Sequence, residues 1–209
     1  MQRIILKFVI LCLLAIILTY FHRNFLNLES LQIESLSNVF TSKQISKFIE
    51  FSQVQQNYIY LVVSLNILLK TFAVAIILFV YCIFQKTKIH FKKVFEVTIT
   101  SEFIFILPII YEIVYFNYFK TNYSFDYIQE FSSLSLFNLF DNYTFEPWYI
   151  YPLQTLNLFE VAYVFYLGIQ IAKLTKSTPD EGLKMVVFSY VPALLLWVCT
   201  IMFLTLNYS

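Results

Sequence analysis

Three ionisable residues, Lys70, Glu102 and Glu160, lie in segments that are otherwise apolar enough to cross a membrane. A charge at the centre of a lone membrane helix costs on the order of 2.5 to 3.5 kcal/mol, so such residues face protein or water and are candidates for a functional site. Opposite charges there could relay protons or ions, contact a polar substrate, or pair to fix the register of the helices. These residues are the first candidates for chemistry.

The positions of these residues along their segments place them at similar depths. Lys70 is 12 residues into a segment that begins at residue 58, which is about 18 Å along a helix. Glu160 is 12 residues after Trp148, in a segment that enters from the same side, and Glu102 is eight residues into one that enters from the other side. We therefore predict a polar centre in which Lys70 pairs with Glu160, Glu102 or both. Neutral hydrogen bonds are expected from the amides of Asn66, Asn157 and Gln154.

This polar centre has a functional and a structural interpretation. In the first it is a relay or a substrate contact, and in the second its charges fix the register of the helices. The sequence shows no broken-helix repeat, whereas transport sites usually need unwound helices between repeats. The structural interpretation is therefore favoured. Because Gly168 and Gly182 are the only glycines, close contacts between helices are expected to rely on Ala, Ser and Thr.

Catalytic and metal-binding chemistry lack their usual residues. His22 and His90 are predicted on opposite sides of the membrane, and the chain has no HExxH motif. Cys12, Cys82 and Cys199 each lie in an apolar run without the spacing of a metal site. We therefore expect no enzyme activity, no cofactor, no metal and no nucleic-acid partner.

The composition is that of an integral membrane protein, with the lipid bilayer as its first partner. Of 209 residues, 59% are hydrophobic, 20% are aromatic and 13% are charged, outside the usual range of soluble domains. A helix needs ~20 apolar residues to cross the hydrocarbon core. The pattern predicts an all-α helical bundle in one domain, 1–209, with five transmembrane helices at about 4–21, 58–84, 94–119, 148–172 and 183–206. The fourth contains polar residues and is expected to face other helices rather than lipid.

Basic residues orient the predicted spans. Nine of the fourteen Lys and Arg fall on one side and four on the other, with Lys70 inside the membrane. The positive-inside rule places the larger group in the cytoplasm. The N-terminus and loops 85–93 and 173–182 are then cytoplasmic, while connections 22–57 and 120–147 and the C-terminus are outside. The basic loop could also bind anionic headgroups or an acidic partner through Lys86, Lys88, Lys92 and Lys93.

Both outside connections contain apolar residues. Thr41 and Gln44 have capping-box spacing ahead of an amphipathic pattern at 45–51, which predicts a short helix on the membrane surface or an ordinary solvated linker. The run 127–140 is too apolar for a free loop and is expected to lie on the bilayer surface or dip into it. In the third span, Pro108 removes a backbone donor and predicts a kink.

The order of elements over roughly residues 58–206 resembles a known family. A span is followed by a K-x-x-F-K-K loop at 88–93, by a span containing Pro108, and by L-N-L-F-E at 156–160, which opens a helix that ends in a short polar loop before the last span. This pattern resembles the Yip family, the Ypt-interacting-protein membrane domain, and looks most like bacterial members of the Bacteroidota type. The resemblance implies five helices, a cytoplasmic N-terminus and a place in the bacterial inner membrane.

The resemblance implies a non-enzymatic accessory or scaffold protein that interacts with lipids, membrane-protein partners or a second copy of itself. The chain departs from the family in its short N-terminal segment and its long outside connections, so the GTPase binding of eukaryotic members is not expected to carry over. Two alternatives remain open. One is a permease or channel component that uses Lys70, Glu102 and Glu160, and the other is a membrane-perturbing, pore-forming effector such as a phage-defence accessory protein.

Overall fold

A computed structural model describes residues 2–37, 40–140 and 145–208. The fold is all-α, with 85% of residues in helices, and confirms the predicted fold class. Five helical stretches are long and apolar enough to cross a membrane. Within the described residues, the only isolated β-bridge joins Ser135 and Asn157.

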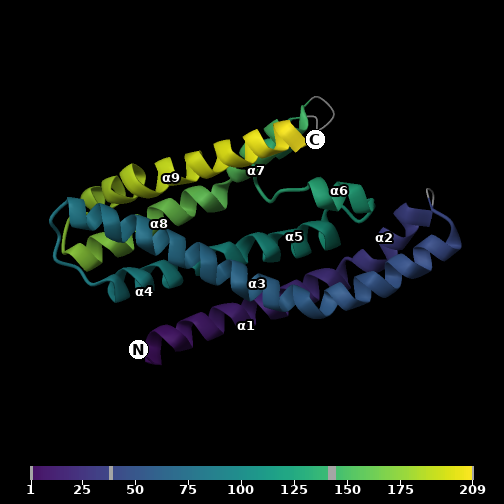
Figure 1. Cartoon of the computed structure of the whole chain (residues 1–209), viewed down its shortest axis with the longest axis horizontal. Coiled ribbons are helices and arrows are strands. Elements are labelled where there is room, and N and C mark those ends of the chain that lie inside the picture. The colour runs from purple at the N-terminus through teal and green to yellow at the C-terminus, as the bar shows by residue number, and fades with distance from the viewer. Residues whose placement is uncertain (1, 38–39, 141–144, 209) are drawn as a thin grey trace.

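The first two long helices run side by side, with a short helix between them (Figure 1). They are α1 (Gln2–Phe25), α2 (Leu28–Ser37) and α3 (Ser42–Phe84). The backbone N–H of Thr41 donates to Gln44 Oε1 at 3.0 Å, as capping-box spacing predicts. The predicted separate surface helix is instead the beginning of α3, because the helix continues without interruption from this cap into the second span.

The third span changes its helical geometry in the middle. It comprises α4 (Phe91–Glu102), the 3-10 turn η1 (Phe103–Phe105) and α5 (Ile106–Tyr118). Pro108 has no N–H to donate to the carbonyl of Ile104, four residues earlier. The 3-10 turn lies at this missing hydrogen bond.

The fourth predicted span is divided into two helices. They are α7 (Pro147–Thr155) and α8 (Leu158–Thr175), separated at Leu156 and Asn157. The prediction of one continuous span over 148–172 is therefore wrong, and of the two helices only α8 is long enough to be a candidate membrane span. The structural interpretation was favoured by the absence of a broken-helix repeat, and the structure shows a single broken helix here, at Leu156 and Asn157.

The break has a long-range cause. The N–H of Leu136 donates to the carbonyl of Leu156 at 2.9 Å, and the N–H of Leu158 donates to that of Leu134 at 3.1 Å. The Asn157 side chain then accepts a hydrogen bond from the Glu160 N–H at 2.8 Å and caps the first turn of α8. The chain segment that follows α6 thus supplies backbone partners that a continuous helix would supply internally.

The last helix, α9 (Pro179–Tyr208), packs along α8. A Cβ atom on Gly182 would lie 2.6 Å from the Cβ of Ala172, and one on Gly168 would lie 2.9 Å from the Cα of Leu183. The closest approach of these helices therefore depends on the two glycines. The expectation that only Ala, Ser and Thr allow close contacts is wrong, since two glycines suffice where they face the same interface. Beside this contact, the core is formed by buried residues of α3, α4, α8 and α9, including Val74, Leu78, Val94, Leu167 and Val186.

The long second connection folds back onto the bundle. It contains α6 (Phe125–Glu130) and the 3-10 turn η2 (Leu136–Leu139). Phe137 is fully buried, and the ring of Phe131 stacks on that of Tyr115 with centroids 4.8 Å apart. Part of the apolar run 127–140 thus packs against protein, whereas Leu134, Leu136, Leu139 and Phe140 remain exposed.

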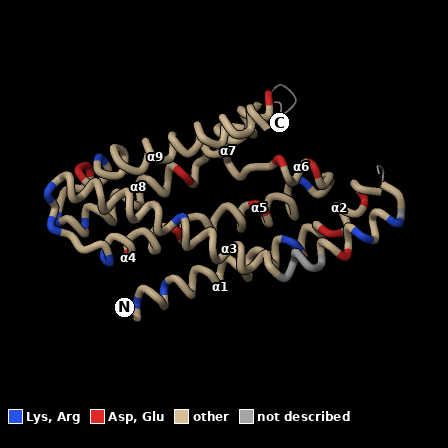
Figure 2. Tube along the Cα trace, in the orientation of Figure 1, with Lys and Arg blue, Asp and Glu red and all other residues tan. Residues whose placement is uncertain are grey.

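The two ends of the bundle carry the elements that the predicted topology assigns to opposite sides. The N-terminus and the turns between α3 and α4 and between α8 and α9 lie at one end, whereas α2, α6 and the C-terminus lie at the other (Figure 1). Lys and Arg cluster at the turns of the first end, and α6 at the opposite end carries Asp and Glu (Figure 2). We call the part of the bundle toward the first end, predicted to be cytoplasmic, the inner half, and the rest the outer half.

Candidate functional site

Lys70 and Glu102 form an ion pair near the middle of the bundle. Lys70 Nζ lies 3.4 Å from Glu102 Oε2, and the Tyr163 hydroxyl donates to Glu102 Oε1 at 2.9 Å. Glu102 is only 4% exposed, so its carboxylate depends on these partners in place of water. Lys70 Nζ also lies 3.1 Å from the centroid of the Phe105 ring, a cation–π contact. One cluster therefore joins α3, α4, η1 and α8.

Glu160 belongs to a neighbouring contact. Its Oε1 accepts a hydrogen bond of 2.6 Å from the hydroxyl of Tyr190 on α9. The rings of Tyr190 and Tyr163 meet edge to face with centroids 5.4 Å apart, which places the two carboxylate contacts next to each other. Among the described residues, Lys70 has an ion pair with Glu102 and none with Glu160.

The predicted amides do not surround Lys70. Asn66 lies on an exposed face of α3, one turn before Lys70. Gln154 Nε2 donates to the carbonyl of Glu130 at 3.2 Å, and Asn157 Nδ2 donates to the carbonyl of Gln154 at 3.0 Å. These two amides belong to the junction between α7 and α8.

The basic loop is exposed at the end of the inner half. Lys86 and Lys88 lie in the turn after α3, and Lys92 and Lys93 lie in the first turn of α4. All four are exposed and available to a headgroup or partner surface.

Two further pairs of ionisable side chains join membrane helices and were not predicted. Lys7 Nζ lies 3.1 Å from Glu96 Oε1 between α1 and α4. His22 Nε2 lies 3.1 Å from Glu112 Oε2 between α1 and α5. Lys7 and Glu96 both lie near the cytoplasmic ends of their predicted spans, so the depth argument applied to Lys70 would have paired them. His22 gave no such signal, because the hydropathy pattern placed it in a connection.

The four carboxylates placed in or at the edge of the membrane therefore all have partners on another helix. They are Glu96, Glu102, Glu112 and Glu160. Polar contacts between membrane helices contribute about 0.6 kcal/mol each on average. Together they connect all five spans, and this use of the charges favours a role in helix register.

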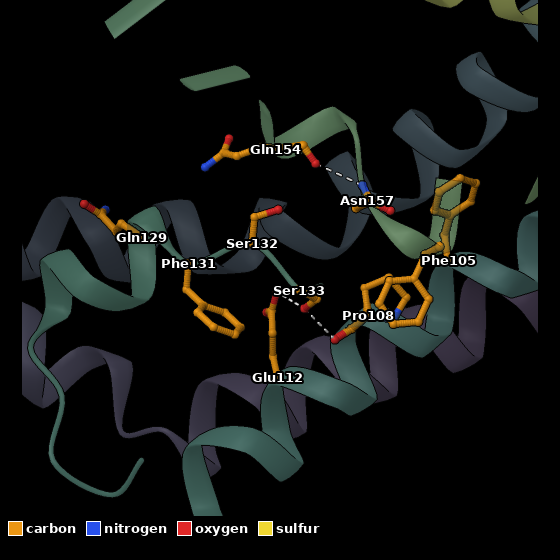
Figure 3. A pocket seen from close by; sticks show the side chains of 10 residues that line it. Phe105, Pro108, Glu112, Gln129, Phe131, Ser132, Ser133, Gln154 and Asn157 are labelled. Atoms are coloured by element: carbon orange, nitrogen blue, oxygen red, sulfur yellow. Dashed lines mark hydrogen bonds between the residues drawn. The ribbon is translucent and has the colours of Figure 1, made fainter. Parts of the chain in front are cut away.

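A polar cavity of about 240 Å³ lies in the outer half, and its lining includes Phe105, Glu112 and Asn157 (Figure 3). Ser132 and Gln154 lie on one side of it and Glu112 and Ser133 on the other (Figure 3). Both helix interruptions border it, through Phe105 of η1 and Asn157 at the start of α8. This arrangement follows the rule that irregular backbone at membrane depth lies against protein or a cavity.

A larger groove of about 1290 Å³ adjoins the cavity. Its apolar lining residues include Leu134, Leu136, Leu156, Leu158 and Val161. Its polar lining residues include Lys120, Ser124, Asp126, Glu130 and Asn138. Phe131 and Asn157 line both the groove and the cavity, so the two spaces meet at these side chains.

These features define a polytopic helical membrane protein with a paired polar centre and two adjoining hollows beside it. No protein-family model, curated protein or solved structure matches the chain.

Proposed function

We propose that the protein is a non-enzymatic membrane accessory protein that binds a lipid in the cavity and groove of its outer half. The accessory role is the one that the resemblance to the Yip family implies. The observation that supports lipid binding is that a polar cavity and an amphipathic groove meet at Phe131 and Asn157. The membrane carboxylates, in contrast, are engaged in contacts between helices.

The groove has the access that a lipid requires. Leu158 and Val161 belong to both the groove and the exposed surface of α8, which is a candidate membrane span. A hydrocarbon chain can therefore reach the groove sideways from the bilayer without crossing a polar surface.

Lipid retention tests this function. The full chain is extracted with a zwitterionic detergent, and the lipids that co-purify with it are identified by native mass spectrometry. We expect one lipid class to be enriched over the membrane extract, and Val161→Trp to remove it by filling the groove. Val187→Trp, at an exposed position of α9 away from the groove, is the matched control. Equal lipid profiles for the wild type, the Val161→Trp variant and the membrane extract would contradict the proposal.

A permease or channel component is the second candidate. It is favoured by the ion pair of Lys70 and Glu102 beside η1, since transporters place substrate and ion sites where helices are interrupted. Proton or cation flux in liposomes, lost in a Lys70→Met variant that is made in normal amounts, would support it. Flux no greater than that of empty liposomes would contradict it.

A further inference from the structure

The cavity and the groove differ in size, so each has room for a different part of a ligand. Ligand sites for drug-sized molecules typically measure about 300–1,000 Å³. The cavity, at about 240 Å³, has room for a head group alone, whereas the groove, at about 1290 Å³, has room for the larger part of a lipid. Because they meet at Phe131 and Asn157, a single amphiphile can occupy both.

The described lining of the cavity carries an acidic side chain and no Lys or Arg. Glu112 is the one carboxylate among the lining residues that the structure describes, and its Oε2 lies 3.1 Å from His22 Nε2. Its Oε1 accepts a hydrogen bond of 2.8 Å from the Ser133 hydroxyl. A phosphate would find no Lys or Arg partner in the described lining, and a phosphate head group is therefore disfavoured.

The remaining polar groups are amides and a hydroxyl. The Gln129 amide, the Ser132 hydroxyl and the Gln154 Oε1 have no side-chain hydrogen-bond partner among the described residues. Amides and hydroxyls both donate and accept hydrogen bonds, which matches the hydroxyl groups of a sugar. The rings of Phe131 and Phe159 provide apolar surface for the carbon-bound hydrogens of the same ring.

We propose that the cavity and groove bind a glycolipid, with its uncharged, hydroxyl-rich head group in the cavity and its hydrocarbon in the groove. The proposal rests on the proposed lipid-binding function and names its ligand class. A phospholipid is the alternative occupant. Its phosphate would lie near Lys120, which lines the groove, and the cavity would take no part in binding.

Competition between lipids of matched acyl chains tests the proposal. The full-length protein, delipidated in a zwitterionic detergent, is offered monogalactosyl diacylglycerol together with phosphatidylethanolamine and phosphatidylglycerol, and retained lipid is measured by native mass spectrometry. We expect the galactolipid to be retained about tenfold over either phospholipid, the effect of matching one or two buried hydrogen bonds.

Variants assign the preference to the cavity. The double change Gln129→Leu with Ser132→Ala is expected to lower galactolipid retention about tenfold, and Gln154→Leu provides an independent check. Lys88→Gln, in the exposed loop at the other end of the bundle, is the matched control and should leave galactolipid retention unchanged. Lys120→Gln shows whether retention of a phospholipid depends on Lys120. Thermal denaturation of each variant confirms that it is folded.

The outcomes separate the ligand class from the function. Equal retention of all three lipids, or retention of phosphatidylglycerol that depends on Lys120, would overturn the glycolipid proposal and leave lipid binding intact. Retention of none of the three would overturn both.

Discussion

At the predicted cytoplasmic end, α8 and α9 meet backbone to backbone at Gly168 and Gly182, whereas at its other end α8 starts from a break in the chain at Leu156 and Asn157. The inner half consists of long helices in direct contact. The outer half contains short helices, 3-10 turns and two hollows. The same helix thus belongs to a tightly packed region at one end and a more open one at the other.

The difference shows how a small membrane protein can combine a fixed register with room for a ligand. In the inner half and at the middle, charged side chains contact each other, as Lys7 does Glu96 and Lys70 does Glu102. In the outer half, several polar side chains point toward a cavity. We therefore expect changes in the inner half to affect folding and changes in the outer half to affect binding.

The largest effect is expected for Gly182→Leu. Even the Cβ of the new side chain would overlap Ala172, and its backbone cannot move without separating α8 from α9. Most of the folded protein should be lost, as measured by fluorescence-detected size-exclusion chromatography. Ala162→Leu, on an exposed face of α8, is the control. If both variants were equally abundant and equally stable, the close packing of the inner half would not matter for folding.

Lys70→Met is expected to have the next largest effect. It leaves the buried carboxylate of Glu102 without its cation, and we expect a loss of about 1–3 kcal/mol, because Lys70 is itself partly exposed. Thermal unfolding in detergent measures the loss, with Lys88→Met in the exposed loop as the control. Adding Glu102→Gln should recover part of the stability. If Lys70→Met alone were as stable as the wild type, the ion pair of Lys70 and Glu102 would have no role in fixing the register of the helices.

Asn157→Ala should act on the outer half alone. The change removes the cap of α8, where the Asn157 side chain accepts from the Glu160 N–H, and caps contribute about 1 kcal/mol. Hydrogen exchange is expected to speed up in the first turn of α8 and to stay slow near Gly168. Asn157→Asp keeps the accepting oxygen but loses the amide donor to the Gln154 carbonyl, so its exchange in the first turn of α8 should be slower than that of Asn157→Ala. Faster exchange along the whole of α8 would mean that the two halves are not independent.

The smallest effect is expected for Ser133→Ala. It removes one hydrogen bond to Glu112 and should lower stability by about 0.6 kcal/mol, the average for polar contacts in membrane proteins. Thermal unfolding compared with Ser132→Ala, whose hydroxyl has no side-chain partner among the described residues, measures the difference. If Ser133→Ala lost more stability than Lys70→Met, the outer half would contribute more to folding than the inner half.

Hydropathy was sufficient to predict the class of fold, because crossing a bilayer demands long apolar helices whatever their packing. Depth was a good guide to which charges lie near each other along the membrane normal. It did not choose between Glu102 and Glu160 as partners of Lys70, because that choice depends on the direction in which each helix points its side chain. Glu160 points toward Tyr190 on α9.

The break before α8 could not be predicted from the sequence of its own segment, for a different reason. Its backbone hydrogen bonds come from Leu136 and run to Leu134, some twenty positions earlier in the chain. A local signal did exist, since Asn157 and Glu160 have the spacing of a cap and its third helical residue. The long apolar run around these residues favoured one continuous span instead.

The unbroken course of α3 links the outer end of the molecule to its polar centre. The helix is 43 residues long, and its part from 42 to 57 extends about 24 Å beyond the candidate membrane span, which begins at Tyr58. The helix bends along its course, but no loop separates the 42–57 part from the segment that carries Lys70 (Figure 1). Continuous backbone hydrogen bonds therefore connect the outer end of the bundle to the ion pair of Lys70 and Glu102.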